Sequence, residues 1–238
     1  MLKAYLKALK NLLFPNLCFC CDNKIFEGYI CSKCLRKITL LKAPLCHGCS
    51  LPLINKQLPL CRQCRKVKPA CDRIISACAY KEPLSQLLQL FKYRHYDYLA
   101  DFFVSLMCRQ IITSGINIRE YDMITPVPCH PDTKKIRGYN QSFLLAELLS
   151  NHFKIPLEND IIQVVCAKTS QTKLPVAKRQ KNVEGVFKVK KEVHNKKIIL
   201  VDDILTTGAT ASSCSRELKA KGAKTVTAVT VAKTIWQL

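Results

Sequence analysis

Residues 198–210 have the sequence IILVDDILTTGAT, and this stretch decides the fold. Its first four residues are consecutive β-formers, which is typical of a buried strand in a parallel sheet. Two acids follow, and then a turn of threonines and glycine opens a helix that ends near Gly222. Residues 224–231 have the composition of a further strand, so the pattern predicts a βαβ unit and an α/β fold class.

The turn that follows the two acids has the composition of a phosphate site. Backbone N–H groups at a helix N-terminus, together with threonine hydroxyls, can hold a phosphate dianion, and Gly208 lets the backbone approach it closely. Asp202 and Asp203 would repel a phosphate, but they can accept hydrogen bonds from a diol, as in a ribose 5-phosphate. We expect both acids to project from the strand end into solvent. The pattern G-x-x-x-x-G-K-[ST] is absent, which excludes a P-loop, and G-x-G-x-x-G is absent too.

The thirteen residues 198–210 resemble the binding motif for phosphoribosyl pyrophosphate (PRPP) in type I phosphoribosyltransferases. Four hydrophobic residues, two acids, two spacers, two hydroxyl residues, a glycine, a spacer and a hydroxyl residue occur in the family's order. The resemblance implies a parallel sheet flanked by helices and a reaction of PRPP with Mg²⁺. It also implies that Asp202 and Asp203 bind the ribose hydroxyls, and that the 5-phosphate is held by Thr206, Thr207, Gly208, Ala209 and Thr210.

A second segment, residues 121–141, places basic residues between a predicted strand and a predicted helix. Its P-V-P…R-G-[FY]-N-Q pattern resembles the ComF family of competence-associated phosphoribosyltransferase-like proteins, in which a zinc-ribbon module precedes the transferase domain. This resemblance covers nearly the whole chain. It implies that residues 126–141 form a basic pyrophosphate loop in which Lys135, Arg137 and Gly138 contact PRPP. Arg137 then joins Asp202 and Asp203 as a catalytic residue.

The cysteines point to metal sites in the N-terminal part of the chain. Nine of the 15 lie within residues 1–64, and eight of these form four Cys-x-x-Cys pairs. Two such pairs complete a closed tetrahedral four-sulfur site, so the pattern predicts two structural zinc ions, with iron–sulfur or redox pairs as the alternative. The simplest grouping is Cys18, Cys21, Cys31 and Cys34, then Cys46, Cys49, Cys61 and Cys64; a cross-braced grouping stays open. Cys20 is expected to be a bystander.

A secreted disulfide protein fits this sequence poorly. The cysteine total is odd, and Lys3, Lys7 and Lys10 interrupt the apolar stretch that a secretory signal needs. Residues 1–13 instead predict an amphipathic helix that packs on its own protein, with a membrane surface or a partner as the alternative. No run of eighteen apolar residues occurs, so we expect no transmembrane segment and a cytoplasmic location. The predicted domains are a basic helix with a double zinc-ribbon module at 1–72 and a phosphoribosyltransferase-like domain at 73–238.

Two polar stretches of the sequence, residues 165–197 and 92–97, lie outside these motifs. Residues 165–197 carry ten Lys or Arg against Glu184 and Glu192, and their position corresponds to the flexible loop that closes over PRPP in type I enzymes. Lys173 and Arg179 are the candidates if this loop closes; a solvated basic loop is the alternative. Residues 92–97 separate two predicted helices and are expected to form a surface loop.

The charge balance admits two functions. Lys plus Arg total 38 and Asp plus Glu total 17, so the formal charge is +21, and two four-thiolate zinc sites at −2 each reduce it to about +17. The favoured hypothesis is a PRPP-binding phosphoribosyltransferase-like protein that acts in DNA uptake, with an unknown acceptor and with competence machinery proteins as possible partners. The alternative is a non-catalytic accessory factor that binds single-stranded DNA, in which PRPP binding is regulatory or vestigial.

Overall fold

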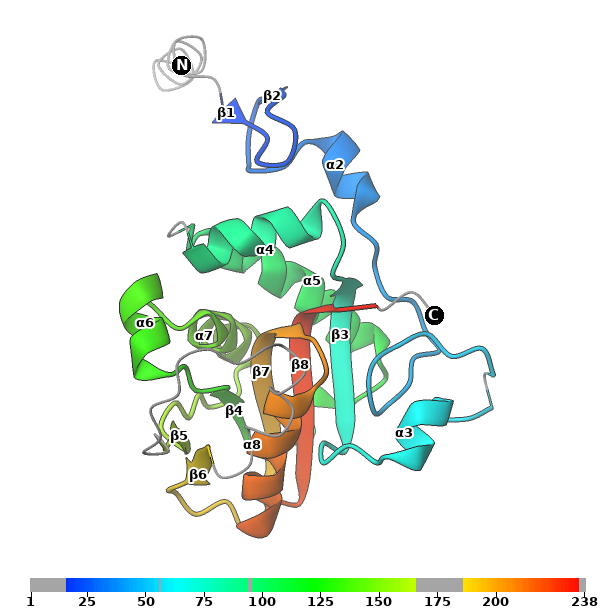
Figure 1. Cartoon of the computed structure of the whole chain (residues 1–238), viewed down its shortest axis with the longest axis vertical. Helices are drawn as coiled ribbons and strands as arrows, with labels where there is room; N and C mark the ends of the chain where they lie inside the picture. Colours follow the sequence, from blue (N-terminus) through cyan, green and yellow to red (C-terminus); the bar gives the residue numbers. More distant parts are fainter. Residues whose placement is uncertain (1–15, 56, 94–95, 166–185, 236–238) are drawn as a thin grey trace, which may run out of the picture.

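The structure, a computed structural model, describes residues 16–55, 57–93, 96–165 and 186–235 (Figure 1). The amphipathic helix expected at residues 1–13 and the loop candidates Lys173 and Arg179 lie outside the described residues. Within the described part of the chain, none of the helices combines the length and the apolar character that crossing a bilayer requires.

Four parallel strands form the central sheet, in the order β3-β8-β7-β4. Their bounds are Arg73–Ala79 for β3, Met123–Pro126 for β4, Lys197–Leu205 for β7 and Thr225–Lys233 for β8. The predicted βαβ unit is confirmed, because β7, the helix α8 (Ala209–Ala220) and β8 follow one another and the two strands pair in parallel. Residues 198–201 of β7 are fully buried, as a strand covered on both faces requires.

Helices cover both faces of this sheet. On one face α4 (Leu84–Tyr93), α5 (Leu99–Thr113) and α7 (Gln141–Phe153) share a hydrophobic cluster with β3, β7 and β8. On the other face α8 packs together with an antiparallel hairpin of β5 (Ile162–Val164) and β6 (Phe187–Val189). A short 3-10 helix, η1 (Ile118–Glu120), leads into β4. The sheet therefore has the two-sided cover that is typical of an α/β domain.

Two cysteine-containing modules precede the sheet. The first comprises the short strands β1 (Asn16–Leu17) and β2 (Lys24–Ile25) and the helix α2 (Ser32–Lys37), and Figure 1 shows it above α4. Its Phe19 and Tyr29 pack against Tyr96 and Tyr98, which lie just before α5. The second module ends in α3 (Arg62–Lys66) and lies beside β3. Each module is thus attached to the sheet domain at a different place.

Residues 39–50, which lead from the first module into the second and include Cys46 and Cys49, run along the outer edge of β3. The β3 amides of Ile74, Ser76 and Ala79 donate to the His47 carbonyl, the Ser50 hydroxyl and the Thr39 carbonyl, at 2.7, 2.9 and 2.8 Å. Leu40 also forms an antiparallel bridge with Cys78. Since β3 is an edge strand, this segment supplies the hydrogen bonds that a fifth strand would otherwise supply.

The strand β7 is longer than its apolar run predicts. It continues through both acids to Leu205, because Asp202 and Ile204 pair with Thr230 and Ala232 of β8. The two acids are therefore strand residues near the carboxyl edge of the sheet, where open α/β sheets bind their ligands.

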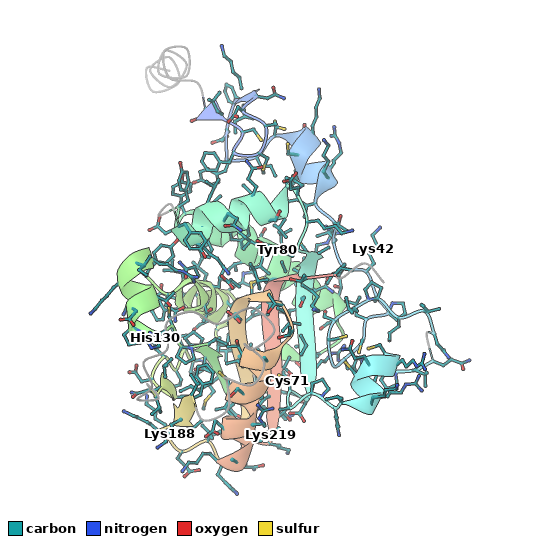
Figure 2. All side chains as sticks on the ribbon, viewed as in Figure 1. Lys42, Cys71, Tyr80, His130, Lys188 and Lys219 are labelled. Atoms are coloured by element: carbon teal, nitrogen blue, oxygen red, sulfur yellow. The ribbon has the colours of Figure 1, made fainter. Side chains whose placement is uncertain are left out.

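The basic segment after β4 contains a helix, α6 (Pro131–Arg137), where a loop was expected. His130 caps this helix by accepting the Asp132 N–H, Pro131 lies in its first turn, and Gly138 ends it at φ 79°. Figure 2 shows His130 where α6 begins. The expectation of a surface loop at residues 92–97 was also wrong at its start, because Lys92 and Tyr93 form the last turn of α4.

Candidate functional site

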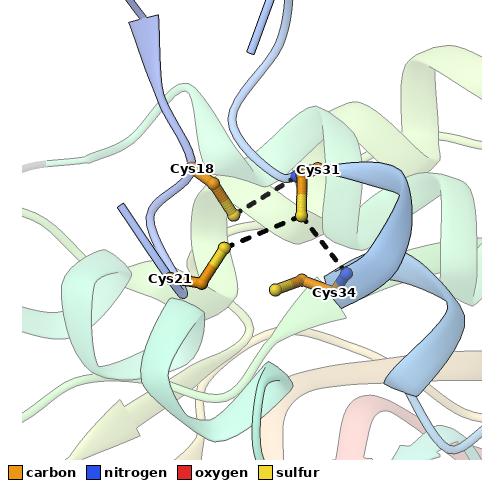
Figure 3. A group of neighbouring side chains, drawn as sticks. All are labelled: Cys18, Cys21, Cys31 and Cys34. Atoms are coloured by element: carbon orange, nitrogen blue, oxygen red, sulfur yellow. Dashed lines mark hydrogen bonds between the residues drawn. The ribbon is translucent and has the colours of Figure 1, made fainter. Parts of the chain in front are cut away.

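The structure gathers the eight paired cysteines into two tetrads, in the sequential grouping. Cys18, Cys21, Cys31 and Cys34 form the first, shown in Figure 3, and Cys46, Cys49, Cys61 and Cys64 form the second. In each tetrad all four sulfur atoms lie within 4.8 Å of one another. Cys20 lies outside the first tetrad, with its thiol directed at the Pro83 carbonyl 3.9 Å away.

The two tetrads repeat one local design. The first cysteine of each, Cys18 or Cys46, is fully buried and accepts a hydrogen bond from the N–H of the third, at 3.3 and 3.2 Å. The second and third sulfurs lie 3.7 Å apart in the first tetrad and 3.8 Å apart in the second. The third cysteine, Cys31 or Cys61, is the N-cap of the helix that follows, α2 or α3.

This geometry fits zinc. A tetrahedral zinc site with metal–sulfur bonds of about 2.3 Å has sulfur–sulfur edges of about 3.8 Å, the separation found in both tetrads. N–H groups that donate to a sulfur stabilise its thiolate form, which is the form that ligates a metal. Four protein sulfurs leave no coordination position for a substrate, so the tetrads suit a structural role.

The helices that follow the tetrads are strongly basic. Lys33, Arg36 and Lys37 lie on α2, Arg62, Arg65 and Lys66 lie on α3, and all six side chains are exposed. Neither helix contains an acid. The modules therefore present two similar cationic helices to solvent.

The two adjacent acids of β7 are held by other side chains, so the expectation that they project freely into solvent was wrong. Asp203 is 7% exposed, and its Oδ2 lies 2.9 Å from Nζ of Lys92 at the end of α4. Asp202 is half-buried, and its Oδ1 accepts hydrogen bonds from Ser142 Oγ and from the Asp203 N–H, both at 2.9 Å. The site therefore contains two fixed carboxylates and one lysine.

Asp202 titrates near neutral pH. Burial, and then the charge of Asp203, raise the pKa of Asp202 to about 7, although the Asp203 N–H, Ser142 and Lys92 act in the opposite direction. A ligand that needs both carboxylates as hydrogen-bond acceptors must therefore compete with a proton at Asp202 below about pH 7.

The turn after β7 has the features of an anion site. Gly208 has φ 81° and starts α8, while Thr206 and Thr207 are exposed. The Ala209 N–H donates to Thr207 Oγ1 at 3.3 Å, and Thr210 lies in the first turn of the helix. A phosphate at this turn would meet the N-terminus of a twelve-residue helix, where backbone N–H groups favour negative charge.

A buried lysine supports this turn from beneath. Nζ of Lys233, at the end of β8, donates to the Thr206 carbonyl at 2.5 Å and to the Thr234 carbonyl at 2.9 Å. Lys233 is only 5% exposed, and burial lowers its pKa. The ammonium group thus fixes the first residue of the turn.

The start of α7 connects Arg137 to the acids. Gln141 Oε1 accepts a hydrogen bond from Arg137 at 3.2 Å, and the next residue, Ser142, donates to Asp202. Lys135 and Gly138 are exposed near the end of α6, and no contact of theirs joins them to the acids. The structure therefore brings together Arg137, both acids and the turn at 206–210, and leaves Lys135 on the outer face of a helix.

Four residues around the acids were not predicted from the sequence as part of the site. Ser142 follows directly after the recognised R-G-[FY]-N-Q pattern, so its position was a usable signal. Lys92, Tyr93 and Lys233 gave none, because a lysine or tyrosine near a helix or strand end is ordinary on a surface. Only the tertiary fold shows that they reach the acids, Arg137 and the turn.

Comparison with known proteins agrees with this two-part organisation. The phosphoribosyl transferase domain family matches residues 140–235, and the double zinc ribbon domain family matches residues 9–65. DNA utilization protein YhgH of Escherichia coli O157:H7 is 30% identical over 221 residues, which cover 90% of this chain and 96% of that protein. Competence protein F of Haemophilus influenzae is 28% identical over 220 residues, which cover 84% and 95%. Among solved structures, a purine phosphoribosyltransferase from Pyrococcus horikoshii Ot3 matches 57% of this chain and 73% of its own, with 19% identity and a TM-score of 0.37.

Proposed function

This chain belongs to the ComF family of proteins with a double zinc ribbon and a phosphoribosyltransferase domain, and we propose that it binds PRPP at Asp202, Asp203 and the turn 206–210. One observation carries the proposal: two adjacent carboxylates on β7 lead directly into a glycine turn at the N-terminus of α8. Carboxylates suit the ribose hydroxyls, and the helix N-terminus suits the 5-phosphate.

The proposed reaction is transfer of the phosphoribosyl group, with release of pyrophosphate. In such a reaction PRPP would bind as its Mg²⁺ complex, and the metal would offset the charge of the departing pyrophosphate. Arg137 would face that pyrophosphate, because Gln141 and Ser142 hold the arginine and Asp202 on the same helix end. Lys135 and Gly138 lie beside Arg137 in the sequence, and Lys135 would contribute positive charge from the outer face of α6. The acceptor is a nucleophile that the site does not identify.

Two further assignments belong to this proposal. Residues 1–72 and 73–238 are the two functional units, with zinc structural in the first and PRPP bound by the second. The location is the cytoplasm, where thiols remain reduced and available to zinc. Calorimetry of the full chain with Mg-PRPP tests binding, and pyrophosphate release in the presence of nucleobases or amines tests turnover.

The affinity for PRPP is expected to rise with pH between 6 and 8. The pKa of Asp202 is raised to about 7, so below that pH the carboxyl is protonated and accepts hydrogen bonds from the ribose less well. Affinity should fall by up to about tenfold for each pH unit below the pKa and level off above it. Calorimetry at half-unit steps measures this profile.

The control for this pH profile is Asp202→Asn, which cannot titrate at this position. Phosphate groups of the ligand ionise near pH 6, and their contribution remains in this variant. If the affinity of the wild type for PRPP changed with pH in the same way as that of Asp202→Asn, the pH dependence could not be due to titration of Asp202.

A second candidate function is binding of single-stranded DNA. The names of the relatives, DNA utilization protein and Competence protein, favour it, and so do the cationic helices α2 and α3. On this proposal the chain acts in DNA uptake together with competence machinery proteins. The DNA backbone would follow the basic modules, away from the acids of β7.

Charge reversal on α2 is expected to flatten the salt dependence of DNA binding. For single strands the log–log slope is about −0.7 per neutralised phosphate, so five contacts give about −3.5. The triple variant Lys33→Glu, Arg36→Glu and Lys37→Glu loses up to three contacts and should approach about −1.4, with PRPP affinity unchanged. Fluorescence anisotropy of a labelled oligonucleotide over a salt series measures the slope.

Arg137→Ala supplies the reciprocal control, because it should weaken PRPP binding and leave most of the DNA affinity. Absence of DNA binding by the wild type near physiological ionic strength would remove this second function and leave the transferase proposal standing.

A further inference from the structure

The last two residues of α4 contact opposite ends of the candidate PRPP site. Nζ of Lys92 lies 2.9 Å from Oδ2 of Asp203, one of the two acids proposed to bind the ribose. The ring of Tyr93 lies beneath Arg137, whose guanidinium carbon is 5.2 Å from the ring centre. The same arginine also points a nitrogen at the Tyr93 hydroxyl, 3.5 Å away. One helix end therefore touches both the diol end and the pyrophosphate end of the site.

This helix end is anchored in the core. Phe91, directly before Lys92, is fully buried and packs edge-on against Phe103 of α5 and against Tyr139. Its carbonyl accepts a hydrogen bond from the Tyr139 hydroxyl, in the segment that follows α6. Lys92 itself has a side chain only 18% exposed, so its position is set by packing as well as by charge.

We infer that Lys92 is a positioning residue of the PRPP site, whose ammonium group holds Asp203 and offsets the charge of the two adjacent carboxylates. This inference rests on the proposed function. Two carboxylates side by side repel each other, and they repel a ligand that carries three phosphate groups. Within the described ranges, Lys92 is the cation that an ion pair joins to this acid pair. Its positive charge favours the ionised form of both carboxylates, which is the form that accepts hydrogen bonds from the ribose.

Within the described part of the chain, few other groups face the acids. Ser142 of α7 donates to Asp202, Cys129 lies near both acids, Arg137 and Lys134, and Cys214 of α8 lies near Asp202. Burial raises the pKa of both thiols, so they stay neutral near pH 7 and add no negative charge to that of the acids. Lys92 lowers the pKa of Asp202, and its removal must therefore raise that pKa above its present value of about 7.

The test compares Lys92→Met, which keeps the apolar stem, with Lys92→Arg, which keeps the charge. Calorimetry with Mg-PRPP at pH 7.5 is expected to show about 10- to 50-fold weaker binding by Lys92→Met, and a loss of no more than about threefold for Lys92→Arg. The pH midpoint of binding should move upward by about half a unit or more in Lys92→Met. Lys81→Met removes the same charge from an exposed position before α4 and should match the wild type. Unchanged or tighter PRPP binding by Lys92→Met would overturn the inference.

A measurement without ligand separates this inference from the proposed function. Lys92→Met should lower the melting temperature of the free protein by about 3 °C or more at pH 8.5, and by less at pH 5.5, where Asp202 takes up a proton. An equal loss at both pH values shows packing alone and overturns the charge role of Lys92. If the wild type fails to bind Mg-PRPP, the proposed function fails, and this thermal comparison still decides whether Lys92 offsets the acid pair.

Discussion

Removal of zinc from the purified protein is expected to unfold the N-terminal modules and to leave the sheet domain largely folded. Elemental analysis of the reduced protein should give about two zinc ions per chain, one for each four-sulfur site. Binding of structural zinc contributes apparent free energies of about 10–16 kcal/mol in zinc-finger peptides, and that energy is folding energy. Half of the eight paired cysteines are buried residues of the modules, so the thiols are themselves much of the core there.

Hydrogen exchange locates the effect of zinc removal. Chelation should abolish amide protection in residues 16–38 and 45–66, whereas the amides of β7 and β8 remain protected. The β3 amides of Ile74, Ser76 and Ala79 are the informative ones, because they donate to residues 39–50. Hydrogen exchange of these three amides should accelerate on chelation, because residues 39–50, which accept their hydrogen bonds, are then no longer held in place by the two zinc sites.

Two cysteine variants provide the control for this experiment. Cys61→Ser should lose one zinc ion, and Cys20→Ser should retain both, because Cys20 lies outside the tetrad beside it. The structural zinc assignment would be refuted if elemental analysis found no metal in the reduced wild-type protein. It would also be refuted if the N-terminal amides kept their protection from exchange after chelation.

Replacement of either diol acid by asparagine is expected to weaken Mg-PRPP binding by about 10- to 100-fold, the loss of one charge-assisted hydrogen bond of about 1.5–3 kcal/mol. The two variants should differ in stability. Asp202→Asn resembles the protonated carboxyl that the wild type already holds near neutral pH, so its folding cost is small. Asp203→Asn leaves the Lys92 ammonium group without its carboxylate partner, and the Lys92 side chain is only 18% exposed. Because an unpaired charge is then largely buried, this variant should have a lower melting temperature than the wild type.

Calorimetry with Mg-PRPP and thermal unfolding measure the two effects of these asparagine variants separately. Asp101→Asn, an exposed acid on α5, is the matched control and should bind PRPP like the wild type. Wild-type affinity in both Asp202→Asn and Asp203→Asn would show that the motif is not a ligand site.

The parts of this molecule that could be predicted from sequence are those with a local signal. The apolar run 198–201, the glycine turn, the helix after it and the strand at 224–231 lie within some thirty-five consecutive residues. The structure confirms the two strands as β7 and β8 and the helix as α8. The paired cysteines could be recognised as metal ligands equally well, because two residues between thiolates is the spacing that lets one turn direct both sulfurs at a single ion. The sequential grouping also follows from short intervals, and the tetrads have it.

The contacts of Asp202 and Asp203 could not be predicted from the sequence, because the residues that make them are far apart along the chain. Lys92 and Asp203 lie more than a hundred positions apart, and a polar stretch between two apolar helices has the same pattern whether it faces solvent or a buried carboxylate. Ser142 and Asp202 lie 60 positions apart, so their contact too is a product of the tertiary fold. The helix α6 is a different case, since Pro131 and Gly138 are ordinary start and stop signals that a basic composition obscured.

The segment along β3 has a consequence for where this protein can be divided. A chain shortened to residues 73–238 would begin at the first residue of β3 and would lack residues 39–50, which accept from its amides. The exposed strand would then be an apolar template with unpaired donors and acceptors on one side, ready to pair with a second copy of itself and to nucleate aggregates. The first cysteine module contacts the sheet domain through aromatic side chains instead. A soluble fragment that contains the sheet domain should therefore begin before Thr39 rather than at residue 73.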